Sequence, residues 1–242
     1  MRRTPVIASR ALSERSGHQV LLKCENLQRT GSFKPRGAYN RIANLSDVER
    51  VKGVVAASAG NHAQGVAWAA TELGIESTVF MPTGAPLPKL VATRAYGATV
   101  HLVGESVDDA LVAAKDFAAS TGAVVIHPFD HEDIVAGQGT VGLEILEQLP
   151  DVGTVLVPVG GGGLLAGIAA AISELAPRVR IIGVQADGAA AWPGSLAAGH
   201  PVALESMSTM ADGIAVGRPG DVPFAHVSKQ VDKIVTVSED AL

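Results

Sequence analysis

One lysine of this chain lies in a setting that suits a reactive amine. Lys34 follows a hydroxyl-bearing and an aromatic side chain, Ser32 and Phe33, and glycines flank the segment on both sides. Pro35 is favourable in the first turn of a helix, so Lys34 is expected near a helix N-terminus, whose positive end lowers the pKa of an ammonium group. A lysine with a lowered pKa has a neutral amine, which can attack a carbonyl group and form an imine.

A second candidate site is a phosphate-binding loop made of four glycines and a leucine: Gly160, Gly161, Gly162, Gly163 and Leu164. The run follows an apolar segment that is predicted to be a strand and precedes one with helical spacing. Because glycines have no side chains, their N–H groups stay accessible and can converge on a phosphate. A nucleophilic amine together with such a loop is the combination that holds pyridoxal phosphate (PLP), an aldehyde that carries a phosphate.

A third polar segment, residues 58–65, follows a predicted strand and opens a predicted helix. The free N–H groups at such a helix start form an anion site, and a substrate carboxylate is a natural ligand. Asn61 is interpreted either as a hydrogen-bond partner of a ring hydroxyl or as a structural residue at the helix start. For His62, a packed or hydrogen-bonded histidine is favoured over a catalytic base.

Other nucleotide-binding motifs compete for the glycine run. A Walker loop needs Gly-Lys-Ser or Gly-Lys-Thr, and neither is present. The spacing of Gly161, Gly163 and Ala166, with Asp187 after the next predicted strand, leaves open a nucleotide-binding α/β oxidoreductase. That alternative gives no role to Lys34 or to residues 58–65, whereas PLP binding uses both.

The elements that must position these residues alternate between strand and helix. Short β-branched runs occur at residues 53–57, 78–81, 98–103, 123–126, 154–157, 180–184 and 233–237, and alanine-rich segments with helical spacing separate most of them. This pattern predicts an α/β fold with parallel-rich sheets covered by helices. Capping boxes predict helix starts at Ser46, paired with Glu49, and at Ser106, paired with Asp109.

We expect two lobes with a ligand site in the cleft between them. The predicted small domain covers residues 39–130. The predicted large, PLP-binding domain covers residues 1–38 and 131–242 and includes a long helix over 133–149. Its apolar run at 155–172 is long enough for a membrane span, but Pro158 and the glycines favour a strand, a turn and a helix instead.

Composition excludes several classes of function. The chain has 242 residues, 47% of them hydrophobic, and a net charge of −5, so nucleic acid is not an expected partner. The N-terminus lacks the apolar core of a secretory signal. The only cysteine, Cys24, lies in a predicted strand and is expected to be a small buried hydrophobe. The crowded acidic and histidine side chains of residues 127–133 are expected to cap a helix and face solvent rather than bind a metal.

Taken together, these segments resemble the fold-type II (β-family) PLP-dependent enzymes, and within them the threonine dehydratase (threonine ammonia-lyase) group. The resemblance covers nearly the whole chain and is carried by residues 25–28, 30–38, 58–65, 136–140, 158–164, 211–213 and 237–240. It implies that Lys34 forms the Schiff base with PLP and removes the α-proton of the substrate. The other roles that it implies are a contact of Asn61 with the ring hydroxyl, phosphate binding by Gly160 to Leu164, carboxylate binding by Ser58, Ala59, Gly60 and His62, and a border of the ring formed by Phe33 and Gly213.

The implied activity is conversion of L-threonine or L-serine to a 2-oxo acid and ammonia by β-elimination, in amino-acid metabolism such as isoleucine biosynthesis. A cytoplasmic homodimer or homotetramer is expected. Alternatives are a serine racemase, a 3-hydroxyaspartate dehydratase, a β-replacement enzyme, or a remnant that binds a ligand without catalysis. Family racemases carry a serine where this chain has Ala59, and acidic metal ligands where it has Gln185 and Ala191, so racemisation and a bound metal are disfavoured. The chain also looks shorter than the family at both ends, which predicts a truncated fold.

Overall fold

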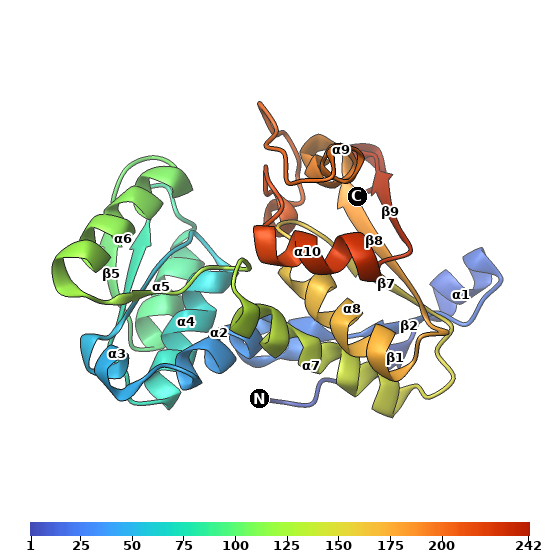
Figure 1. Ribbon diagram of the computed structural model, residues 1–242, viewed down its shortest axis with the longest axis horizontal. Helices are drawn as coiled ribbons and strands as arrows, with labels where there is room; N and C mark the ends of the chain where they lie inside the picture. The colour runs from blue at the N-terminus through green and yellow to red at the C-terminus, as the bar shows by residue number, and fades with distance from the viewer.

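The computed structural model describes residues 1–242 as two lobes, each built on a parallel sheet covered by helices (Figure 1). The seven strands expected from the β-branched runs are all present, and the α/β fold is confirmed. Both capping boxes also form, at the N-termini of α3 (Asp47–Lys52) and α6 (Val107–Thr121).

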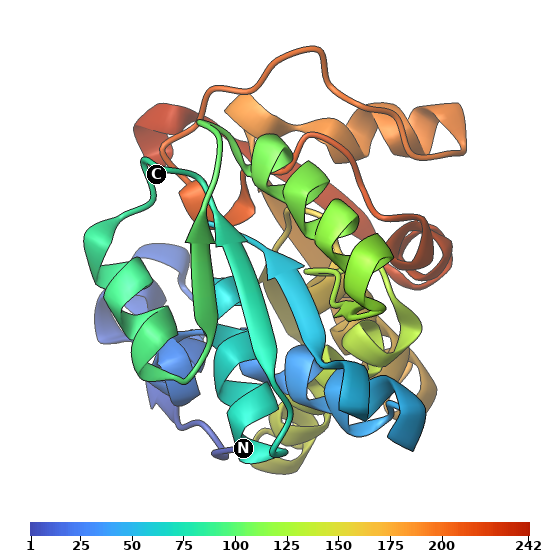
Figure 2. The ribbon, with the colours of Figure 1, turned by 90° about the vertical axis from the view of Figure 1, so that its left-hand side faces the viewer.

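The small lobe contains a four-stranded parallel sheet in the order β5-β4-β3-β6. Its strands and its other two helices are β3 (Val54–Ala57), α4 (Asn61–Glu72), β4 (Ser77–Met81), α5 (Leu87–Ala95), β5 (Thr99–Leu102) and β6 (Val124–Val125). Helices α4 and α5 cover one face of the sheet and α6 covers the other (Figure 2). Alanines such as Ala67 on α4 and Ala114 on α6 are fully buried against the sheet, because a small side chain lets a helix lie close to it.

The large lobe contains a three-stranded parallel sheet in the order β7-β8-β9. Its elements are α7 (Glu132–Gln148), β7 (Thr154–Pro158), α8 (Gly163–Leu175), β8 (Arg180–Ala186), α9 (Ala191–Ala198), α10 (Asp221–Gln230) and β9 (Lys233–Val237). The main core lies between the sheet and helices α7, α8 and α10. The apolar run at 155–172 therefore forms β7, the glycine turn and α8, as predicted, and no helix of the chain has the length and apolar character of a membrane span.

The N-terminal segment contains an antiparallel pair of β1 (Val6–Ala8) and β2 (Leu21–Lys23), with α1 (Arg10–Ser16) between them, and it contacts the large lobe. The Lys23 ammonium donates hydrogen bonds to the side chains of Glu144 and Gln148 on α7. The sequence predicted a strand around β2 but not its antiparallel partner β1, because a strand of three residues is too short to show a pattern. The expectation that Cys24 is buried is wrong: it follows β2 and is partly exposed, so its thiol is not part of a core.

Helix α2 (Lys34–Ala43) packs on α4 of the small lobe and on α7 of the large lobe. Glycines make both contacts close. A Cβ on Gly65 of α4 would lie 3.1 Å from the Lys34 carbonyl carbon, and one on Gly137 of α7 would lie 2.5 Å from the Arg36 carbonyl oxygen. The proposed domain boundary at residues 38 and 39 thus falls inside a helix that joins the two lobes; the division itself remains a proposal.

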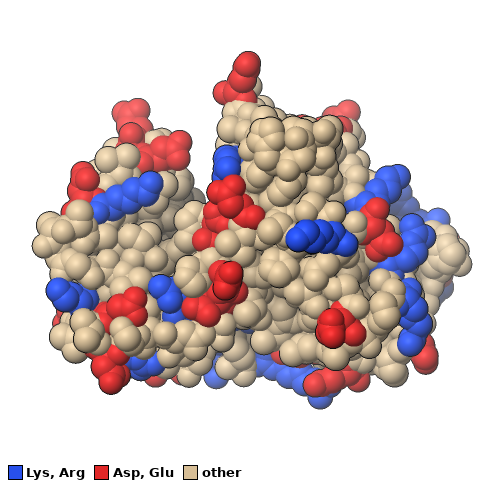
Figure 3. Space-filling model, viewed as in Figure 1, with Lys and Arg blue, Asp and Glu red and all other residues tan.

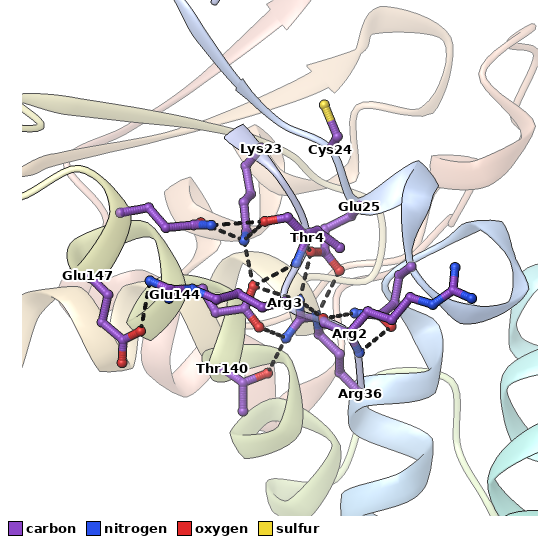
Figure 4. Close-up of polar contacts among 12 residues, drawn as sticks. Arg2, Arg3, Thr4, Lys23, Cys24, Glu25, Arg36, Thr140, Glu144 and Glu147 are labelled. Atoms are coloured by element: carbon purple, nitrogen blue, oxygen red, sulfur yellow. Dashed lines mark hydrogen bonds and ion pairs between the residues drawn. The ribbon is translucent and has the colours of Figure 1, made fainter. Parts of the chain in front are cut away.

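An ion network fixes α2 to the large lobe (Figure 4). The Arg36 side chain is 1% exposed and donates to both carboxylate oxygens of Glu25, at 2.8 Å each. It also donates to Glu144 at 2.7 Å and to the Thr140 hydroxyl at 3.0 Å. Because a buried guanidinium is strongly destabilising without such partners, the network holds the first turn of α2 against Glu25 and α7.

Candidate active site

Lys34 is the first residue of α2, and its amine lies at the junction of the two lobes. The Nζ atom donates a hydrogen bond to the Pro128 carbonyl oxygen at 3.0 Å and forms no ion pair with a carboxylate. Burial lowers the pKa of Lys34 to about 8. The lowered pKa is as predicted, and burial, which the sequence did not suggest, is its cause. A substantial fraction of this amine is therefore neutral near physiological pH.

Two histidines lie near this amine, and both are kept neutral. Burial, together with the charge of Lys34, lowers the pKa of His62 to about 3. The His62 ring accordingly donates from Nε2 to the Ile126 carbonyl oxygen at 2.7 Å, so the interpretation as a buried, hydrogen-bonded residue is confirmed. Burial also lowers the pKa of His127, whose Nδ1 accepts from the N–H groups of Phe129 and Asp130.

The glycine run forms a cradle of unpaired donors. The backbone N–H groups of residues 160–165 donate to no protein acceptor. Helix α8 begins here with Gly162 at its N-cap, with no side-chain cap and no acidic residue in its first turn. Unpaired N–H groups and the positive end of a helix together favour a bound anion. This arrangement of donors is suited to an anion such as a phosphate.

Aromatic side chains explain why larger residues would not fit in this run. A Cβ on Gly161 or Gly163 would lie 2.5 or 2.9 Å from atoms of Phe129, and one on Gly162, whose φ is 98°, would collide with Trp192. The Trp192 indole also donates to the Gly160 carbonyl oxygen at 2.7 Å. The glycines therefore keep the donors bare and also make room for the two rings.

The amine and the cradle are adjacent. Pro128, which accepts from Lys34, is bonded to Phe129, which contacts Gly161 and Gly163. One peptide unit thus connects the nucleophile to the anion site. These two groups fit the aldehyde and the phosphate of PLP.

The polar segment 58–65 lies beside the same lysine. Helix α4 begins at Asn61 without a side-chain cap, and the N–H groups of residues 61–63 donate to no protein acceptor. The Ser58 hydroxyl accepts from the Gly60 N–H at 3.1 Å, which shapes the turn before the helix. Since Gly65 of α4 packs on the backbone of Lys34, these unpaired N–H groups are held near that lysine.

Phe33 and Gly213 also lie near these groups. The Lys34 Nζ is 5.3 Å from the centre of the Phe33 ring. Gly213 is exposed in a short 3-10 helix, η4 (Asp212–Ile214), and its neighbour Ile214 would contact a Cβ placed on Gly160. The structure thus brings the sequence-predicted residues together around the junction of the lobes, while their individual roles toward a ligand remain proposals.

Two features of the site were missed in the sequence. Residues 127–133 were expected only to cap a helix, and His131 does cap α7, but Pro128 and Phe129 belong to the site. Their position directly after the predicted strand at 123–126 was a usable signal, because ligand sites gather at the carboxyl ends of parallel strands. The other feature is an ion pair between Lys89 on α5 and Asp212, which joins the two lobes.

Comparison with known proteins decides between PLP and the nucleotide-binding alternative. The sequence profile of the family described as pyridoxal-phosphate dependent enzymes matches residues 1–242.

The chain belongs to this family.

Family members with similar sequences include proteins named L-threonine ammonia-lyase and L-threonine dehydratase. An L-threonine ammonia-lyase of Thermotoga maritima is 53% identical over 240 residues, which are 99% of this chain and 60% of that protein. A catabolic L-threonine dehydratase of Escherichia coli is 46% identical over 240 residues, 99% of this chain and 73% of that protein. The chain therefore spans about 60% of the length of the first of these curated relatives.

Solved structures agree with the fold. The processed form of threonine deaminase isoform 2 from Solanum lycopersicum superposes with a TM-score of 0.96 at 44% identity, over 99% of this chain and 70% of that one. Maize serine racemase superposes with a TM-score of 0.95 at 39% identity, over 99% of this chain and 73% of that one. Lyases and a racemase thus share this fold, so the reaction must be argued from the site.

Proposed function

We propose that this protein is a PLP-dependent ammonia-lyase that converts L-threonine or L-serine to a 2-oxo acid and ammonia by β-elimination. The observation that carries the proposal is the Lys34 amine, with a pKa of about 8 and no carboxylate partner, one peptide unit from a glycine cradle of unpaired N–H groups. The names of the similar threonine ammonia-lyase and threonine dehydratase support the choice of substrate.

In this proposal the N–H groups of residues 160–165 hold the phosphate, Phe33 and Gly213 border the ring, and Asn61 contacts the ring hydroxyl. When bound, the cofactor supplies an electron sink for the negative charge that develops at the substrate Cα. Lys34 Nζ takes the α-proton, because it is the group at the junction whose pKa lies close to neutral pH. Loss of the β-hydroxyl and hydrolysis then give the 2-oxo acid and ammonia.

The substrate carboxylate is assigned to the start of α4, formed by Ser58, Ala59, Gly60 and His62. His62 acts there through its backbone N–H, since its ring is buried and neutral. Ala59 offers no acid or base at the position where the family resemblance places the serine of the racemases. A racemase needs such a group, which supports elimination over racemisation. For the whole protein, a homo-oligomeric state and a cytoplasmic location remain proposals.

The deciding experiment combines trapping with turnover. The protein is loaded with PLP, reduced with borohydride, digested and mapped by mass spectrometry; we expect the cofactor on the peptide that contains Lys34. Formation of 2-oxobutanoate from L-threonine is then compared in wild type, Lys34→Ala and a control, Lys52→Met, on the outer helix α3. A Lys34→Ala protein that still turns over threonine would disprove the assignment, whereas cofactor uptake without turnover in wild type would indicate a binding remnant.

A further inference from the structure

An ion pair bridges the two lobes next to the proposed carboxylate site. The Lys89 ammonium, in the first turn of α5, lies 3.2 Å from a carboxylate oxygen of Asp212 in η4. Lys89 belongs to the small lobe and Asp212 to the large lobe, and a notch separates the lobes at the molecular surface (Figure 3). The pair therefore joins the two lobes.

The same ammonium lies against the start of α4. A Cβ on Gly60 would be 3.2 Å from Lys89 Nζ, so the charge is next to the turn that presents the free N–H groups of residues 61–63. Residues 58–65 contain no lysine or arginine, and the His62 ring is neutral. Lys89 is thus the cation that the carboxylate site otherwise lacks.

We infer that Lys89 is the counter-charge for the α-carboxylate of the amino-acid substrate at this loop. The inference rests on the proposed function, which places an amino acid there. Neutral N–H donors alone leave an anion without a full opposite charge, and an ammonium within a few ångströms supplies one by direct Coulomb attraction. Lys89 would bind the substrate in this way without taking part in proton transfer.

The existing partner of Lys89 does not prevent this role. The Asp212 side chain is 82% exposed and that of Lys89 is 31% exposed. An ion pair with so much solvent contact contributes little, because water screens it. A substrate carboxylate at the helix start would meet the same ammonium together with three N–H groups, so it would compete with Asp212 for Lys89.

The test compares two ligands that differ in the carboxylate. L-Alanine has no β-leaving group, and L-alaninamide also lacks the negative charge. Their affinities for the PLP-loaded protein are measured by isothermal titration calorimetry in wild type, Lys89→Met, Lys89→Arg and Lys52→Met. We expect Lys89→Met to weaken L-alanine about tenfold, as loss of about 1.4 kcal/mol would, while L-alaninamide changes less than about twofold. Lys89→Arg and Lys52→Met should stay near wild type.

The inference is overturned if Lys89→Met leaves L-alanine binding unchanged, if it weakens both ligands equally, or if wild type binds both equally. The PLP content of each variant, measured after free cofactor has been removed, shows whether the site is intact, and Lys89→Arg keeps the charge if Lys89→Met folds poorly. Failure of the proposed function is distinguishable. If the protein forms no 2-oxobutanoate but Lys89→Met still weakens L-alanine binding, the proposed lyase activity is refuted. The inferred role of Lys89 toward the carboxylate is then retained.

Discussion

The contact between α2 and α7 gives the sharpest test of how Lys34 is positioned. Gly137 lies inside α7, and a Cβ there would be 2.5 Å from the Arg36 carbonyl oxygen and 2.7 Å from the Cα of Gly37. Nonbonded carbon atoms prefer about 3.5–4.0 Å, so Gly137→Ala must push the two helices apart by about 1 Å. Both contacted atoms belong to the backbone and cannot rotate away.

The size of the effect follows from two opposing terms. Overpacking a tight site costs roughly 1–3 kcal/mol, and a contact with rigid backbone belongs at the upper end of that range. Replacing glycine by alanine inside a helix returns about 1 kcal/mol. We therefore expect Gly137→Ala to lower the free energy of unfolding by about 2 kcal/mol, which for a chain of this size lowers Tm by roughly 4–8 °C.

The matched control is Gly194→Ala. Gly194 lies inside α9, and a Cβ there would meet nothing within 4 Å. This variant should gain about 0.5–1 kcal/mol from the helix preference alone. Urea and thermal unfolding followed by circular dichroism measure both variants, and PLP uptake reports on the displaced Lys34. Equal or greater stability of Gly137→Ala, relative to wild type, would refute the view that this glycine sets the distance between α2 and α7.

Three further predictions concern charge. The folded pKa of Lys34, about 8, lies below the usual 10.5, so below pH 8 the buried ammonium reduces the free energy of unfolding. Lys34→Met removes this buried charge and should therefore raise the urea midpoint of the apoprotein at pH 7. The same variant should abolish turnover. For the same reason the rate of PLP uptake by wild-type apoprotein, followed by absorbance, should rise with pH and level off above about 8. Burial opposes ionisation of Glu144, but hydrogen bonds from Arg36 and Lys23 lower its pKa below 4.5, so its contribution to stability is complete above that pH and is lost as pH falls. Urea midpoints from pH 7 to 3 should show that loss in wild type and a flatter curve in Glu144→Gln.

Much of the fold was predictable because its signals are local. The β-branched runs mark strands buried in parallel sheets, and the capping boxes at Ser46 and Ser106 mark helix starts within four residues of sequence. Lys34 and the glycine run were recognisable for the same reason: each carries its chemistry within a few consecutive residues.

The rest depends on contacts between distant residues. Pro128 accepts from Lys34 across 94 positions, and Lys89 meets Asp212 across 123, so no local pattern points to either contact. The cause of the lowered Lys34 pKa was also out of reach, since burial is decided by the packing of α4 and α7 around α2. For Cys24 a local pattern was misleading. The apolar residues before it predicted a buried strand, but β2 belongs to a small two-stranded sheet and Cys24 is partly exposed.

The glycines of α4, α7 and α8 have one more consequence. Gly65 abuts Lys34, Gly137 abuts Arg36 and Gly37, and Gly139 abuts Gly167, so main chain touches main chain from the small lobe through to the helix that carries the anion cradle. Side chains exchange between rotamers, but a contact between two backbones contains no side-chain torsion that could change in this way. The spacing between the backbone of α2, which carries Lys34, and that of α8, which carries the cradle, is thereby set by backbone contacts rather than by side-chain packing.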